Sequence, residues 1–183
     1  MKLLAVFLLV FSMMTESSGD PVPDGGSPGD AASSDVSADE ASDQVDLLQR
    51  SDSCPSGWTR INSRCFQYVQ KSMSWAKAEK NCLSMGANLA SVQDLNEYRK
   101  IKAMIDKISY GAKEAWIGGT NAQELTIWLW SDGSNFSYSD WCPGEPNNGG
   151  GNQRCIQINY SGEKCWDDMW CDHLQPSVCV KKP

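Results

Sequence analysis

The stretch from Trp141 to Cys171 gathers side chains that could bind a metal ion. It holds four of the eight cysteines and includes a Glu-Pro-Asn triplet, a glycine run and a Trp-Asp-Asp triplet. Carboxylate and amide oxygens on an irregular, cross-linked loop suit calcium, which takes about six to eight oxygen ligands at about 2.3–2.6 Å in a flexible polyhedron. The candidate ligands are Glu145, Asn147, Gln153, Asp167 and Asp168.

The first 50 residues differ in composition from the rest of the chain. Residues 1–19 have a basic start, an apolar run and a small-residue end, which is typical of a secretory signal peptide. A signal anchor is the alternative, but the apolar run is shorter than the roughly 20 residues of a membrane-spanning helix. Residues 20–50 contain eight acids and one base, so we expect a disordered linker, or a propeptide cleaved after Arg50.

Residues 51–183 form the candidate folded domain. They carry 14 acidic and 14 basic residues, so the net charge of −7 belongs to the leader and nothing indicates nucleic-acid binding. All eight cysteines lie here, and an even number behind a signal peptide predicts four disulfides and a secreted, extracellular protein. A zinc site is the alternative, but there is no Cys-x-x-Cys pair and His173 is the only histidine.

Two stretches have the apolar spacing of amphipathic helices. The first begins near Trp75, which we expect in the core, and ends at Gly86. The second follows a capping-box-like pair, Ser91 and Asp94. Its expected buried face comprises Leu95, Tyr98, Ile101 and Ile105.

Short runs of large apolar residues predict strands, so the expected fold class is α+β. Residues 131–152 are rich in Ser, Asn, Gly and Pro and predict a long loop, which a metal ion and disulfides could order. The expected strands cover residues 54–58, 65–69, 115–119, 127–130, 155–160 and 176–180.

Three motifs and the cysteine framework together resemble the C-type lectin-like domain over about residues 54–181. The motifs are Trp116-Ile117-Gly118-Gly119, Glu145-Pro146-Asn147 and Trp166-Asp167-Asp168. The resemblance implies two helices flanking antiparallel sheets, with a long calcium-ordered loop. It implies the long form of the domain, with a fourth bridge like that of fish type II antifreeze proteins and related fish lectins. The implied bridges are Cys54–Cys65, Cys82–Cys179, Cys142–Cys165 and Cys155–Cys171.

The resemblance also implies the calcium ligands and the sugar-binding residues. Glu145 and Asn147 would flank a cis proline, and Asp167, Asp168 and Gln153 would complete the set. Gln153 replaces the family's usual Glu and Asp167 its usual Asn, so three carboxylates remain and we expect calcium binding to survive. Two hydroxyls of a mannose-type sugar would bind the ion together with Glu145, Asn147, Gln153 and Asp167.

The expected function is therefore that of a secreted lectin, with a role in innate defence, that recognises a glycan on a cell or microbial surface. Ice binding and a metal-free protein-interaction domain are the alternatives. In the last case Trp141 and Trp170 could be anchors, although we expect both to pack against the disulfides. A homo-oligomer would add avidity.

Two other features bear on function. With one histidine, no Gly-x-Ser-x-Gly elbow and no phosphate loop, the sequence gives no indication of an enzyme. Glycosylation sequons begin at Asn135 and Asn159, both in expected loop or turn contexts.

Overall fold

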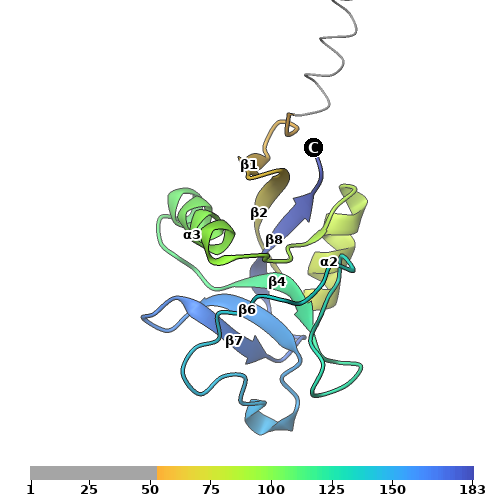
Figure 1. The fold of residues 1–183 in the computed structure, drawn as a ribbon, viewed down its shortest axis with the longest axis vertical. Helices are drawn as coiled ribbons and strands as arrows, with labels where there is room; N and C mark the ends of the chain where they lie inside the picture. Colours follow the sequence, from red (N-terminus) through yellow and green to blue (C-terminus); the bar gives the residue numbers. More distant parts are fainter. Residues whose placement is uncertain (1–52) are drawn as a thin grey trace, which may run out of the picture. The chain divides into compact units, whose positions relative to one another are not determined.

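The computed structural model describes residues 53–183, so the expectations for residues 1–19 and 20–50 lie outside the described part. Figure 1 shows the fold. Among the described residues no helix is both long and apolar enough to cross a bilayer. The elements are β1 (Thr59–Ile61), β2 (Arg64–Met73), α2 (Trp75–Ser84), β3 (Asn88–Leu89), α3 (Leu95–Ser109), β4 (Ala115–Thr120), β5 (Leu129–Trp130), the 3-10 turn η1 (Gly149–Gly151), β6 (Cys155–Tyr160), β7 (Cys165–Met169) and β8 (Gln175–Lys181).

The strands of the described domain form one mixed sheet in the order β1-β2-β8-β4-β6-β7, with β3 added to β8 and β5 to β4. Its pairings are antiparallel except for β4 with β8, which run parallel. In Figure 1 the two helices lie on opposite sides of the β2–β8 pair, and β6 and β7 extend away from it. This extension carries the residues of interest, because β7 contains both Asp167 and Asp168.

Two hydrophobic clusters hold the layers together. The larger one packs the buried face of α3, including Tyr98, Ile101 and Ile105, against the sheet and Trp166. The smaller one packs Ala78 and Cys82 of α2 against Leu89 and Trp116. Trp75 is half-buried against the smaller cluster and donates from Nε1 to the carbonyl of Ile117 at 2.8 Å, which agrees with its expected place in the core.

The second helix begins later than the sequence predicts. Its N-cap is Asp94, which accepts a hydrogen bond from the backbone N–H of Glu97 at 2.8 Å. Ser91 cannot cap the helix because its hydroxyl is bound between Arg64 and Asp132. Leu95 becomes the first helical residue and is 42% exposed, so its expected burial is wrong.

The other expected elements are present with shifted ends. Residues 54–58 are not a strand, because the first hairpin pairs Thr59–Ile61 with Arg64–Phe66. Strand β5 is limited to Leu129–Trp130, and β3 was not predicted. Residues 131–152 form a long loop, as expected. All four expected disulfides form: Cys54–Cys65, Cys82–Cys179, Cys142–Cys165 and Cys155–Cys171.

The two helix starts offer a matched comparison of capping. Asp94→Ala removes the side-chain acceptor of Glu97 N–H and should lower the free energy of unfolding by about 1 kcal/mol. Ser74, the N-cap of α2, makes no side-chain capping bond, so Ser74→Ala should change the free energy of unfolding much less. Urea denaturation measures both, and equal losses would contradict the assigned caps.

Candidate metal centre

Three carboxylates converge at the end of β7. Oxygens of Glu145, Asp167 and Asp168 lie within 4.8 Å of one another, and both aspartates are buried. Every salt bridge found among residues 53–183 involves Arg64, so no lysine or arginine of this part neutralises the cluster. Like charges this close repel strongly in a site shielded from water, so the arrangement favours a bound cation.

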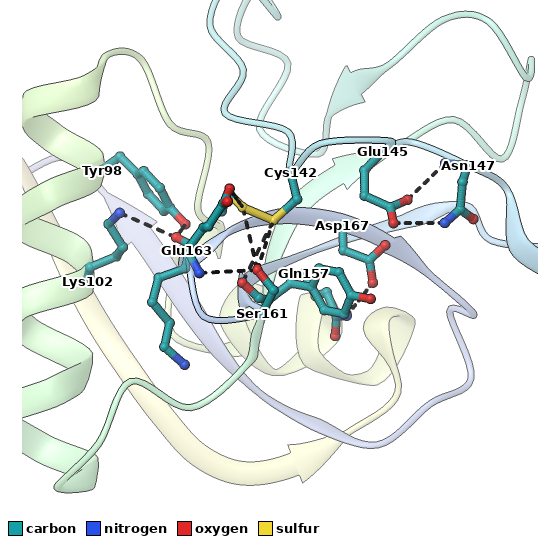
Figure 2. Close-up of a disulfide and its surroundings, with 12 residues drawn as sticks. Tyr98, Lys102, Cys142, Glu145, Asn147, Gln157, Ser161, Glu163 and Asp167 are labelled. Carbon is teal, nitrogen blue, oxygen red and sulfur yellow. Dashed lines mark hydrogen bonds between the residues drawn. A yellow bond between two sulfur atoms is a disulfide. The ribbon is translucent and has the colours of Figure 1, made fainter.

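The loop holds two of these acids through backbone and side-chain hydrogen bonds. The backbone N–H groups of Asn147 and Asn148 each donate to one carboxylate oxygen of Asp168, both at 2.9 Å. The Asn147 side chain donates from Nδ2 to Glu145 Oε1 at 2.8 Å, and the Glu145–Pro146 peptide bond is cis, as the resemblance implies. Figure 2 shows Glu145 and Asn147 side by side on the loop, with Asp167 close beneath them.

Two amide oxygens approach the same part of the loop. An added Cβ at Gly149 would lie 2.7 Å from Gln153 Oε1 and 3.0 Å from Asn147 Oδ1, so a larger residue there would displace these two side-chain oxygens. Gln153 is buried, and its Oε1 has no hydrogen-bond partner among the described residues. An orphaned buried oxygen beside an acidic cluster has the chemistry of a hard-cation ligand.

The environment of Asp167 disfavours its charged form. Burial and the nearby negative charges of Glu145 and Asp168 raise its pKa to about 7, against the opposing effect of a hydrogen bond from Gln157. The set of oxygens therefore fits calcium, which would offset both the burial and the repulsion.

The sequence did not predict two polar residues behind Asp167. Gln157 Nε2 donates to Asp167 Oδ2 at 2.6 Å, and Gln175 Nε2 donates in turn to Gln157 Oε1. Both glutamines are buried in the sheet. A signal existed in β6, where a polar residue interrupts the apolar run Cys-Ile-Gln-Ile.

The comparisons identify the domain. A family model described as the lectin C-type domain matches residues 71–181. The chain belongs to the C-type lectin family. Ladderlectin of Oncorhynchus mykiss is 41% identical over 140 residues, which cover 76% of this chain and 74% of ladderlectin. The galactose-specific lectin nattectin of Thalassophryne nattereri is 39% identical over 129 residues, covering 70% of this chain and 80% of nattectin.

A solved structure has the same fold. The herring type II antifreeze protein superposes with a TM-score of 0.67 at 38% identity, covering 71% of this chain and 99% of the antifreeze protein. The family, the fold and the resemblance to fish lectins and antifreeze proteins are thus confirmed.

The two tryptophans beside the site of this lectin domain differ in their packing. Trp141 is half-buried and contacts Trp128 and Trp166, with ring centroids 4.9 Å and 5.8 Å away. Trp170 is 42% exposed, so its expected burial is wrong. It lies beside the loop, where a Cβ added at Gly150 would be 3.4 Å from its indole.

The two sequons of the lectin domain also differ. Asn135 is exposed in the long loop, as expected. Asn159 lies inside β6, is 1% exposed and donates from Nδ2 to the carbonyl of Lys113 at 2.9 Å, so its expected loop context is wrong.

This difference predicts a single glycan. When the chain is secreted from eukaryotic cells, we expect peptide-N-glycosidase to remove one glycan, because Asn135 is exposed whereas Asn159 is buried with its amide nitrogen hydrogen-bonded to Lys113. Mass spectrometry should show that Asn135→Gln abolishes the mass loss and Asn159→Gln preserves it. Loss of the glycan in Asn159→Gln would contradict the prediction.

The raised pKa of Asp167 predicts competition between protons and calcium. With a pKa of about 7, Asp167 holds a proton below neutrality, and calcium must displace it. The apparent calcium affinity should therefore approach a tenfold fall per pH unit, on the order of 50-fold between pH 7 and pH 5. Calorimetry at a series of pH values measures this dependence. The variant Asp167→Asn should make the calcium affinity nearly independent of pH over this range. A wild-type affinity that stays constant down to pH 5 would contradict the prediction.

Proposed function

We propose that this chain is a secreted, calcium-dependent, carbohydrate-binding lectin. The observation that supports it most is the cluster of Glu145, Asp167 and Asp168, for which residues 53–183 offer no cationic partner. Carboxylates and an orphaned amide oxygen are hard donors, and this donor class suits calcium rather than copper or zinc. The described cysteines are all bridged, so thiolates do not compete for the ion.

The side chains around the ion would also select the sugar. A calcium-bound hydroxyl both donates and accepts hydrogen bonds, so it needs one acceptor and one donor beside it. Glu145 with Asn147 supplies such a pair, and Asp167 with Gln153 supplies a second. Two neighbouring hydroxyls of one pyranose can therefore be bound at once.

Glu145-Pro146-Asn147 favours a mannose-type sugar by resemblance. In the second pair, however, the acid and the amide have exchanged positions relative to the family pattern. Galactose is therefore the competing ligand, and the relative nattectin, a galactose-specific lectin, points the same way.

The proposal also includes secretion and a glycan partner. Four disulfides require an oxidising compartment, and residues 1–19 have the composition of a signal peptide. The partner would be a glycan on a cell or microbial surface, bound by several copies of the domain when avidity is needed.

Ice binding is the second candidate, because the herring type II antifreeze protein is 38% identical and shares the fold. A protein partner is the third, with exposed Trp170 as its anchor. Thermal hysteresis distinguishes ice binding from both other functions.

The lectin proposal predicts sugar binding that requires calcium. In calorimetry, the secreted protein should bind mannose in calcium, bind galactose more weakly, and bind neither in chelator. Asp168→Ala should reduce calcium affinity at least tenfold, because Asp168 would lose its contact with the ion. Asp172→Ala is the matched control, since Asp172 is an exposed acid four residues away and should leave binding unchanged.

Other outcomes assign the site differently. Tighter binding of galactose would retain the lectin but reverse its specificity. Calcium binding without either sugar, together with thermal hysteresis, would replace the lectin with an ice-binding protein. Absence of calcium binding would contradict the proposed function.

A further inference from the structure

Two buried glutamines connect the centre of the sheet to the acidic cluster. Gln157 lies opposite Asp167 in the register of β6 and β7, so their side chains share one face of the sheet. Its Nε2 donates to Asp167 Oδ2 at 2.6 Å, and Figure 2 shows it beneath that carboxylate. Gln175 on β8 donates from Nε2 to Gln157 Oε1. The result is a one-way chain of donors from β8 to the acid.

The direction of this chain is set at Asp167, because an ionised carboxylate can only accept hydrogen bonds. Gln157 therefore turns its amide nitrogen toward Asp167 and its Oε1 toward Gln175, which donates from Nε2. The reverse orientation of Gln157 would place an amide oxygen against a carboxylate oxygen. Gln157 is fully buried, so water cannot replace either partner.

Each buried acid therefore has its own donors. Asp168 is held by the backbone N–H groups of Asn147 and Asn148, which belong to the loop. Asp167 is held by Gln157, which belongs to the sheet, with one oxygen occupied and the other left for the cluster. The loop and the sheet thus each place one of the paired aspartates.

We propose that Gln157, which accepts a hydrogen bond from Gln175, is a positioning residue that makes Asp167 a one-oxygen ligand of the metal ion. This inference rests on the proposed calcium site. It also accounts for an acid at position 167 where the resembling family has an amide, because a buried carboxylate there needs a donor behind it and Gln157 supplies one. Groups that orient metal ligands typically change affinity about 10–100-fold when they are removed.

The test uses terbium, a luminescent substitute for calcium, on the full secreted chain. Luminescence lifetimes in light and heavy water give the number of water molecules on the ion. In Gln157→Met, Asp167 loses its donor, so we expect about one additional bound water and an affinity lower by about tenfold. Ser177→Ala is the control, because Ser177 is a buried residue of β8 whose hydroxyl has no hydrogen-bond partner among the described residues.

A charge exchange tests the direction of the hydrogen bond. Gln157→Glu places a second carboxylate against Asp167 and should weaken terbium binding more than Gln157→Met does. In the double variant with Asp167→Asn, the new amide can donate to the new carboxylate, so a donor again faces an acceptor. The number of water molecules bound to terbium should then return to the wild-type value. A purely structural role of Gln157 predicts no such recovery.

The outcomes separate this inference from the function on which it rests. If wild-type protein binds no terbium and no calcium, the calcium site itself fails. If wild-type protein binds and Gln157→Met keeps the same affinity and hydration, only the positioning role fails. Unfolding in chelator completes the test, because lower stability with unchanged hydration would show that Gln157 supports the fold alone.

Discussion

Mutual repulsion among three carboxylates is the constraint around which the rest of the domain is arranged. Glu145, Asp167 and Asp168 approach within 4.8 Å, and the described chain places no cation among them. Bringing these charges together costs free energy, which burial increases. The fold must therefore hold them in place against this repulsion, and the structure between Trp141 and Cys171 supplies the contacts that do so.

Covalent bonds and aromatic packing supply the necessary rigidity. Cys142–Cys165 ties the start of the Glu-Pro-Asn loop to β7, and Cys155–Cys171 ties β6 to the segment after β7. Trp166, next to the paired aspartates, is surrounded by five aromatic rings with centroids 5.7–6.3 Å away. The strand is thus anchored at the residue that precedes its two acids, and neither acid can withdraw into solvent.

Much of this architecture could be predicted from the sequence, because helices, strands and cysteine spacing leave periodic or countable signals. The number of bridges follows from the count of cysteines, whereas their pairing and the family were implied by the resemblance of the motifs to the C-type lectin-like domain. Contacts between distant residues leave no such signal. Three features depend on which strands become neighbours. They are the contact of Arg64 with Ser91, which keeps Ser91 from capping the helix, the exposure of Trp170, and the hydrogen bond from Gln157 to Asp167.

We propose that calcium relieves the repulsion in this cluster, and the free energy of unfolding measures that relief directly. Urea denaturation of the secreted protein should be repeated at rising calcium concentrations and in chelator. A site that binds only in the folded state predicts stabilisation that grows with the logarithm of calcium, to about 2.7 kcal/mol at 100 times the dissociation constant. Equal stability with saturating calcium and with chelator would contradict the account.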